Sequence, residues 1–251
     1  MDIEFYRHYS NALEAAKAPA WRYNEMKPCG FNYNSFILAR VYDTYHQMFR
    51  DYRGEAEQIV ARLGLDASAT VLDMGCGTGA FALNAAAYYE TVHAVDVSKA
   101  MLGRARREAK KAGLKNIQFH NGGFLTYEHQ ADPVDGISTS IALHHLPDFW
   151  KLVGLTRLAA MLKPGGRLHL FDVVFSFDIG QYESCFEQFT QRMSVQIGPN
   201  GEAESQTHLR EEYSTCDWIM EGLLERAGFV MDVKDYQDDF LASYLCTKKG
   251  E

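Results

Sequence analysis

The chain has 251 residues, of which 47% are hydrophobic and 23% charged, and its net charge is −8 at pH 7. This composition allows a complete core for one enzyme-sized α/β domain with some elaboration, and the acidic balance argues against a nucleic acid as the main partner. The five scattered cysteines form no CxxC pair and the apolar stretches are too short to span a membrane, so we expect a reduced, cytoplasmic protein with no membrane partner and no disulfide framework.

Short apolar runs alternate with helical periodicity between residues 70 and 175. This pattern predicts βαβ units on a parallel sheet. The expected strands are 71–74, 92–97, 117–120, 136–141 and 167–175. Helices are expected over 80–89, over 98–112 with Ser98 as its N-cap and Gly113 at its end, and over 147–162, followed by a turn at 163–166.

The pattern changes after residue 175. Residues 176–213 are polar, aromatic and irregular, with a break at 197–201, and we predict that they cap the sheet. A helix is expected over 216–227, followed by an antiparallel pair of strands over 229–236 and 240–247. The fold class is therefore α/β, with a doubly wound, mostly parallel seven-stranded sheet that ends in an antiparallel hairpin.

Glycines are concentrated between the first strand and the first helix, in the stretch Asp73-Met74-Gly75-Cys76-Gly77-Thr78-Gly79-Ala80. Glycine lets the backbone turn tightly and lets a ligand approach the peptide groups. Asp96 ends the second strand, where a carboxylate can bind the two hydroxyl groups of a ribose. Gly75, Gly77 and Ala80 also satisfy a dinucleotide fingerprint, so the loop alone does not distinguish a nicotinamide cofactor from another adenosyl cofactor.

Five segments together resemble the class I, Rossmann-like S-adenosylmethionine-dependent methyltransferases. These segments are VLDMGCGTGA at 71–80, AVDVS at 94–98 with Met101 and Leu102, SIALHHL at 140–146, LKPGG at 162–166 and AGF at 227–229. They span roughly two thirds of the chain in the order and spacing of that family. A dehydrogenase is not expected to carry the His-His-Leu and Lys-Pro-Gly-Gly segments or the terminal hairpin.

The resemblance implies the domain organisation and the cofactor. It divides the chain into an N-terminal helical cap (1–54), a cofactor-binding core (55–175), a helical cap insertion (176–213) and a helix and hairpin that complete the core (214–251). The implied cofactor is S-adenosylmethionine, which becomes S-adenosylhomocysteine. The implied contacts are Asp73, Gly75, Cys76, Gly77 and Gly79 to the methionine part, Asp96 to the ribose, Val97 and Met101 to the adenine, and the backbone of Ser140 and Ile141 near the sulfonium. Tyr42 resembles a position near the cofactor carboxylate.

One position departs from the family pattern. The family often has an acidic residue after the third strand that binds the adenine amino group, and Gly123 stands in its place here. Adenine recognition is then expected to use backbone groups, Asn121 or a water molecule, with Phe124 as a packing surface.

The acceptor side is less defined. His145 is a candidate general base because histidine titrates near neutral pH, although a structural or substrate-positioning role fits it equally well. His144, His93 and His169 show no ligand spacing, so the sequence predicts packed or solvated histidines and no metal site. Cys29, Cys185 and Cys216 lie in the capping segments and either bind a thiophilic acceptor or are incidental.

We therefore expect methyl transfer to a small molecule. The alternatives are a different reaction of the same cofactor and a non-catalytic cofactor-binding protein. The aromatic residues of the first fifty positions either line the acceptor pocket or form the core between cap and sheet.

Overall fold

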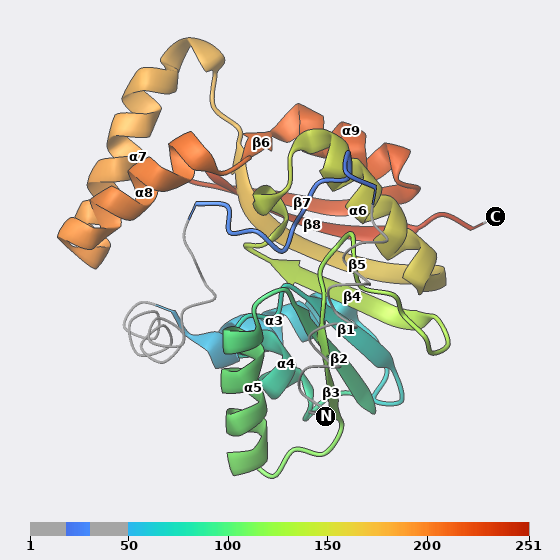
Figure 1. Ribbon diagram of the computed structural model, residues 1–251. Helices are drawn as coiled ribbons and strands as arrows, with labels where there is room; N and C mark the ends of the chain where they lie inside the picture. Colours follow the sequence, from blue (N-terminus) through green and yellow to red (C-terminus); the bar gives the residue numbers. More distant parts are fainter. Residues whose placement is uncertain (1–18, 31–49, 251) are drawn as a thin grey trace.

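A computed structural model describes residues 19–30 and 50–250 of the chain. Its centre is a sheet with the strand order β3-β2-β1-β4-β5-β8-β7, as seen in Figure 1. The strands are β1 (Thr70–Met74), β2 (Thr91–Asp96), β3 (Ile117–Asn121), β4 (Val134–Ser140), β5 (Leu162–Phe175), β7 (Phe229–Gln237) and β8 (Leu241–Lys248). The first five are parallel, whereas β8 runs antiparallel to both β5 and β7. A two-residue strand, β6 (Thr215–Cys216), pairs with the end of β5, so the predicted closing hairpin is β7–β8.

Helices cover both faces of the sheet (Figure 1). One face carries α3 (Tyr52–Leu63), α4 (Ala80–Ala85) and α5 (Lys99–Lys111), and the other carries α6 (Asp148–Met161) and α9 (Asp217–Arg226). Parallel strands covered on both faces need apolar side chains on both sides, and β1 provides them. Val71 belongs to the core beneath α3 and α4, whereas Leu72 and Met74 belong to the core beneath α6 and α9.

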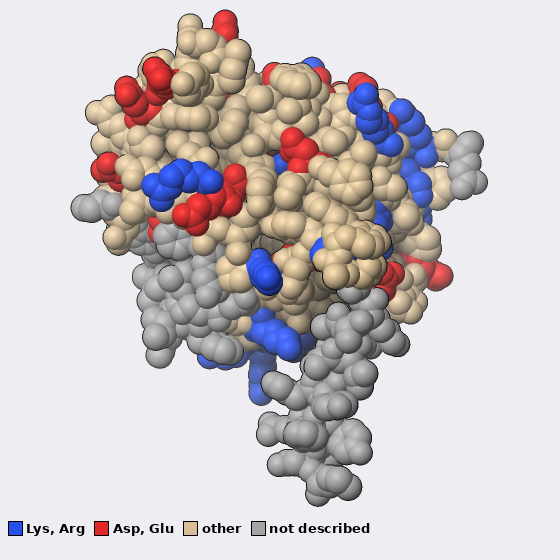
Figure 2. Space-filling view, turned by 45° about the horizontal axis from the view of Figure 1, so that its top comes forward, with Lys and Arg blue, Asp and Glu red and all other residues tan. Residues whose placement is uncertain are grey.

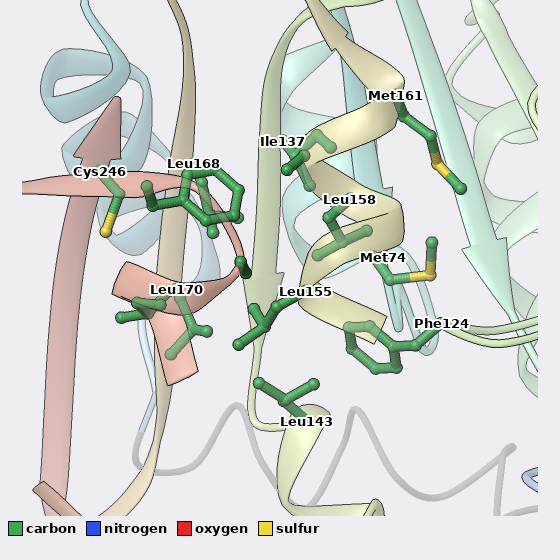
Figure 3. Packing of buried hydrophobic residues seen from close by; sticks show 14 of the residues in the cluster. Met74, Phe124, Ile137, Leu143, Leu155, Leu158, Met161, Leu168, Leu170 and Cys246 are labelled. Atoms are coloured by element: carbon green, nitrogen blue, oxygen red, sulfur yellow. The ribbon is translucent and has the colours of Figure 1, made fainter. Parts of the chain in front are cut away.

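The larger core lies between α6 and the sheet, as Figure 3 shows. Leu155 and Leu158 of α6 point toward the strands, where Ile137 of β4 and Leu168 of β5 are fully buried. Their spacing of three residues places both side chains on the same face of α6. Phe124, from the segment after β3, closes the same core beside Met74.

The cap insertion is helical on both sides of its predicted break. α7 (Tyr182–Ile197) and α8 (Pro199–Glu211) are joined at Gly198, whose φ of 81° is accessible to glycine at little cost. The two helices pack side by side and extend away from the sheet (Figure 1). An aromatic cluster fixes the base of α7, where Phe175 and Phe177 contact Phe186 and the ring of Phe240 stacks on Phe189.

Some element boundaries differ from the sequence prediction. The helix predicted over 80–89 ends at Ala85, and Leu162, predicted as helical, begins β5. Residues 163–166, predicted as a turn, lie within β5 as a local excursion. Val134 pairs with Leu162 and Gly136 with Arg167, so β4 advances two residues while β5 advances five. Gly165, with a φ of 74°, makes this excursion possible.

Within residues 19–30 and 50–250, no helix combines the length and apolar character that crossing a bilayer requires.

Candidate active site

A cavity of about 220 Å³ opens at the carboxyl ends of β1, β2 and β4. Because β1 has β2 on one side and β4 on the other, this is the point where the strand order reverses, and open α/β sheets bind ligands in that crevice. The predicted site residues that line it are Asp73, Gly75, Cys76, Gly77, Asp96, Val97, Met101, Gly123, Phe124, Ser140, Ile141 and His145. Tyr42 lies outside the described residues.

The glycine loop needs its glycines for two separate reasons. Gly75 and Gly77 have φ values of 77° and 54°, in the left-handed region. A Cβ atom on Gly75 would lie 2.5 Å from Ala142 Cβ, so this glycine also lets the loop after β4 approach the loop after β1. Gly79 differs from the prediction, because it packs against Leu83 and Ala105 and does not line the cavity.

Two buried carboxylates stand on the cavity wall. Asp96 Oδ2 accepts a hydrogen bond from Gly77 N–H at 2.8 Å, and its Oδ1 accepts one from Ser98 N–H at 2.7 Å. Asp73 Oδ2 accepts from Ala82 N–H at 3.2 Å. Burial, together with the nearby negative charge of Asp96, raises the pKa of Asp73 to about 7, while its hydrogen bond from Ala82 opposes the shift. A cation bound in the cavity would therefore favour the ionised form of Asp73.

The position of the missing acidic residue is occupied by Glu25, which sequence reasoning did not identify. A Cβ atom on Gly123 would lie 2.6 Å from Glu25 Oε2, so the glycine makes room for this carboxylate. Glu25 Oε1 accepts hydrogen bonds from Leu125 N–H at 3.0 Å and from the Thr126 hydroxyl at 2.7 Å. Glu25 also lines the cavity. Burial raises the pKa of Glu25, whereas these hydrogen bonds lower it. Glu25 comes from the N-terminal segment, about a hundred residues away along the chain.

The side chain of Asn121 is hydrogen-bonded to the backbone at the end of β2. Its side-chain amide donates hydrogen bonds to the backbone oxygens of Asp96 and Val97, both at 3.0 Å. These bonds hold the turn that carries Asp96. Asn121 is not among the residues that line the cavity, so of the expected adenine contacts the backbone groups of Gly122 and Gly123 are the ones beside it.

The loop after β4 bends sharply at the cavity. Ile141 has a φ of 51°, which is a strained conformation for a β-branched residue, and its N–H donates to Phe171 O at 2.7 Å. This conformation starts the 3-10 helix η1 (Leu143–His145). His145 faces the cavity, and its Nδ1 lies 3.1 Å from Ala142 O. Burial and the positive charge of His144 lower the pKa of His145 to about 4, so its ring is neutral at pH 7.

His144 belongs to a buried charged network, and this corrects its interpretation as an ordinary packed histidine. Its Nδ1 lies 2.5 Å from Asp172 Oδ1, and its Nε2 lies 3.3 Å from Glu212 Oε2. His208 Nδ1 also contacts Glu212 Oε2. Burial lowers the pKa of His144, but the charges and hydrogen bonds of Asp172 and Glu212 outweigh this and raise it to about 9. Burial likewise raises the pKa of Glu212, but its bonds to the two histidines outweigh burial and hold it well below its usual range.

Sequence reasoning therefore did not identify this carboxylate–histidine cluster. Glu212 follows α8 and lies far along the chain from the loop after β4, so the spacing of its partners in the sequence carried no signal. Gly30 lets the N-terminal segment approach the same carboxylate, because a Cβ atom there would collide with Glu212.

The three capping cysteines are separated. Cys29 lines the cavity, and its thiol donates to Glu211 O at 3.0 Å. Cys185 lies on α7 and Cys216 ends β6, and neither lines the cavity. The described residues therefore do not assemble a three-thiol site.

On the face shown in Figure 2, acidic and basic side chains occur in small separate groups within a largely uncharged surface.

The chain is similar to known methyltransferases in sequence and in fold. Residues 71–166 match the model of a methyltransferase domain. The chain is 28% identical over 197 residues to an uncharacterised methyltransferase of Bacillus mycoides, covering 78% of this chain and 84% of that protein. Its fold is similar to a crystal structure of an S-adenosylmethionine-dependent methyltransferase from Clostridium acetobutylicum, with a TM-score of 0.63, 14% identity and coverage of 85% and 98% of the two chains. It is also similar to the [4+2]-cyclase SpnF, with a TM-score of 0.65, 15% identity and coverage of 89% and 98%.

The sheet order, the domain match and the curated relatives define a Rossmann-like methyltransferase fold. Residues 71–166 therefore carry a methyltransferase domain, and the whole chain is similar to S-adenosylmethionine-dependent methyltransferases in its fold. The structural similarities concern the fold alone, because one scaffold can host several reactions.

Proposed function

We propose that this protein transfers a methyl group from S-adenosylmethionine to a small-molecule acceptor. The observation that carries the proposal is the Asp96 carboxylate at the end of β2, held against the glycine loop and facing the cavity. Each of its oxygens already accepts one backbone hydrogen bond and keeps a lone pair for a further donor. Two ribose hydroxyls are donors of the right number and spacing for these oxygens.

The other predicted contacts fit the rest of the cofactor. The buried Asp73 carboxylate favours a cation nearby, which suits the ammonium group of the methionine part. A Cβ atom on Gly77 would meet no atom within 4 Å, so the loop leaves open space for a ligand there. Val97 and Met101 line the cavity beyond Asp96 and would enclose the adenine.

Glu25 would supply the acidic contact that Gly123 lacks. Its Oε1 is held by two donors, whereas its Oε2 lies over Gly123 beside Val97. An adenine amino group between Val97 and Met101 would donate to that oxygen. Cofactor binding would then add a further contact between Glu25 and the core.

S-adenosylmethionine supplies an electrophilic methyl group whose leaving thioether needs no proton. The contribution of the chain is therefore to align the acceptor and to exclude water, which is worth several kcal/mol. His145 faces the same cavity, but with a pKa of about 4 it is a weak base at neutral pH. His145 is therefore better placed to position the acceptor than to remove a proton from it, and its Nδ1 is held by Ala142 O.

The test is calorimetric titration of the purified protein with S-adenosylmethionine, S-adenosylhomocysteine and NADH. We expect micromolar binding of the two adenosyl ligands. Asp96→Asn keeps the shape of the side chain but removes its charge, so binding should weaken by about 10- to 100-fold, as expected for charge-assisted hydrogen bonds worth 1.5–3 kcal/mol.

The matched control is Asp132→Asn, at an exposed position away from the cavity, which should bind like the wild type. Binding of NADH in place of the adenosyl ligands would contradict the proposal. Binding of S-adenosylmethionine without methyl transfer to any acceptor would favour another reaction or a non-catalytic role.

A further inference from the structure

Three side chains beside the cavity form a compact set of metal-ligand atoms. One nitrogen from each of His144 and His145 and one oxygen from Glu212 lie within 4.8 Å of one another. The separations are 3.3 Å from His144 Nε2 to Glu212 Oε2 and 4.0 Å from His145 Nε2 to Glu212 Oε1. The side chains of His144 and Glu212 are almost completely buried, with exposures of 4% and 5%, so this is not a solvated surface cluster.

The hydrogen bonds around the set fix which atoms face each other. His144 Nδ1 contacts the Asp172 carboxylate and His145 Nδ1 contacts a backbone oxygen, and both of these partners only accept hydrogen bonds. Each ring therefore carries a proton on Nδ1 and directs Nε2 toward Glu212. In the metal-free network His144 is protonated, so its Nε2 proton faces Glu212, and a bound metal ion would replace this proton.

We propose that His144, His145 and Glu212 bind a divalent transition-metal ion of the zinc type, with an open coordination position toward the cavity. Two imidazoles and one carboxylate with a free position are a ligand set of catalytic zinc sites. His144 and His145 both line the cavity, so the open position would be accessible to a small molecule.

The surrounding contacts are those that orient metal ligands. Metal-binding histidines usually donate their other N–H to a carboxylate or a backbone oxygen, as both rings do here. Asp172 is itself fixed by backbone N–H groups of Leu143 at 2.8 Å and His144 at 3.1 Å. His208 holds Glu212 from the side of α8.

The distances allow an ion with small adjustments. Ligands about 2.0–2.1 Å from a tetrahedral zinc ion lie about 3.4 Å from one another. His144 Nε2 lies 3.3 Å from Glu212 Oε2, which matches this value, whereas His145 Nε2 lies 4.0 Å from the other oxygen, Oε1, which is about 0.6 Å more. A small rotation of the His145 ring, which is more exposed at 29%, would close that gap.

The ion also suggests an acceptor class, a step that rests on the proposed function. A small molecule with an S–H or O–H group would lose its proton to solvent and bind through the ionised atom. A lone pair of that atom forms the bond to the methyl carbon. The methyl carbon–sulfur bond of the cofactor then breaks with its electron pair on sulfur, and the neutral thioether leaves.

The test uses the full chain, stripped with EDTA and then freed of the chelator. Zinc is titrated by calorimetry, and cobalt is titrated by visible absorption. We expect one ion per chain with a Kd below about 1 μM, and a visible cobalt spectrum of a four-coordinate site with nitrogen and oxygen ligands. Titration with S-adenosylmethionine on the same samples measures cofactor binding separately, so the two proposals can fail independently.

The decisive variants are His145→Gln and Glu212→Gln, with His129→Gln and Glu187→Gln as matched controls outside the cluster. Loss of one ligand should weaken zinc binding by on the order of 100-fold, while the controls bind like the wild type. If Glu212→Gln does not fold, the more exposed His145→Gln still decides. The assignment is overturned if the folded wild type takes up neither ion, if both variants bind normally, or if cobalt shows the near-ultraviolet band of thiolate ligands.

Discussion

At the scale of single residues, Glu25 and Gly123 illustrate how one carboxylate can be supplied from two places in a chain. In this protein a glycine, Gly123, stands in the loop after β3, and the side chain of Glu25 from the N-terminal segment occupies the space beside it. The geometry makes the two positions exchangeable, because a side chain at 123 and the side chain at 25 compete for the same volume.

The exchange can be tested by mutation. Glu25→Ala should weaken S-adenosylmethionine binding by about 10-fold or more, since it removes a hydrogen-bond acceptor that carries charge. In the Glu25→Ala background, Gly123→Asp should restore part of the lost affinity, whereas Gly123→Asp alone should not strengthen binding because Glu25 obstructs it. Calorimetry on the four proteins gives the coupling between the two sites. Additive effects would show that the two carboxylates do not share a position.

Most of the residues predicted for the site line the cavity, but sequence reasoning missed the carboxylates that come from distant segments of the chain. Asp73, Asp96 and the glycines could be predicted because they occupy strand ends and a tight turn, which have local signals. Glu25 and Glu212 have no such signal. Each is placed by a long-range contact that depends on how the capping segments cross the edge of the sheet.

At the scale of elements, α5 begins where its sequence indicated. Ser98 Oγ accepts a hydrogen bond from Met101 N–H at 3.2 Å, and Gly113 follows the helix with a φ of 70°. The N-cap residue Ser98 also adjoins the site, because its N–H donates a hydrogen bond to Asp96. The backbone donor survives any change of the Ser98 side chain, so stability and cofactor binding can be separated here.

Ser98→Ala should lower the free energy of unfolding by about 1 kcal/mol, the usual cost of losing an N-cap hydroxyl. Urea unfolding monitored by circular dichroism measures this loss. Ser184→Ala, on the exposed side of α7, is the control and should change stability by less than about 0.5 kcal/mol. S-adenosylmethionine affinity should change by less than about 3-fold in Ser98→Ala, because Asp96 keeps its backbone donor. A larger loss of affinity would mean that the hydroxyl itself contacts the ligand.

The helices and element boundaries that the sequence did not predict are those that depend on contacts with other parts of the chain. The helices α7 and α8 carry few periodic apolar residues, because they extend from the sheet and pack mainly on each other. The end of α4 at Ala85 and the excursion within β5 depend on neighbouring strands. In contrast, α6 faces a continuous apolar core, so its spacing was sufficient to predict it.

At the scale of the whole molecule, the fold is two apolar cores on either side of one sheet, and histidines are buried within this frame. His169 lies on β5, and its Nε2 is 3.2 Å from Ser243 Oγ on the paired strand β8. Burial, together with the positive charge of Arg62, lowers the pKa of His169 to about 4. In the unfolded chain the same ring titrates near 6.5.

This shift makes stability depend on pH in a defined direction. Between pH 6.5 and 4 the unfolded chain binds a proton at residue 169 that the folded chain does not bind, so the free energy of unfolding falls as the pH falls. The contribution is fully present above pH 6.5, and about 2 kcal/mol of it should be lost at pH 5, since one pKa unit corresponds to 1.36 kcal/mol. His169→Gln keeps an amide that can bond to Ser243 and removes the titration. The difference in free energy of unfolding, variant minus wild type, should therefore be about 2 kcal/mol more positive at pH 5 than at pH 7.5, as measured by urea unfolding.

Ser243→Ala separates this electrostatic effect from the loss of a hydrogen bond. It removes the partner of His169 but keeps the buried ring, so its stability should be lower than that of the wild type at both pH values with the same pH dependence. If the free energies of unfolding of His169→Gln and the wild type fall by the same amount from pH 7.5 to pH 5, the His169 ring takes up its proton in the folded state as well. The core between β5 and β8 then accommodates a charge. If His169→Gln instead gains about 2 kcal/mol in free energy of unfolding relative to the wild type at pH 5, the buried His169 ring between these two strands is a source of the acid sensitivity of the fold.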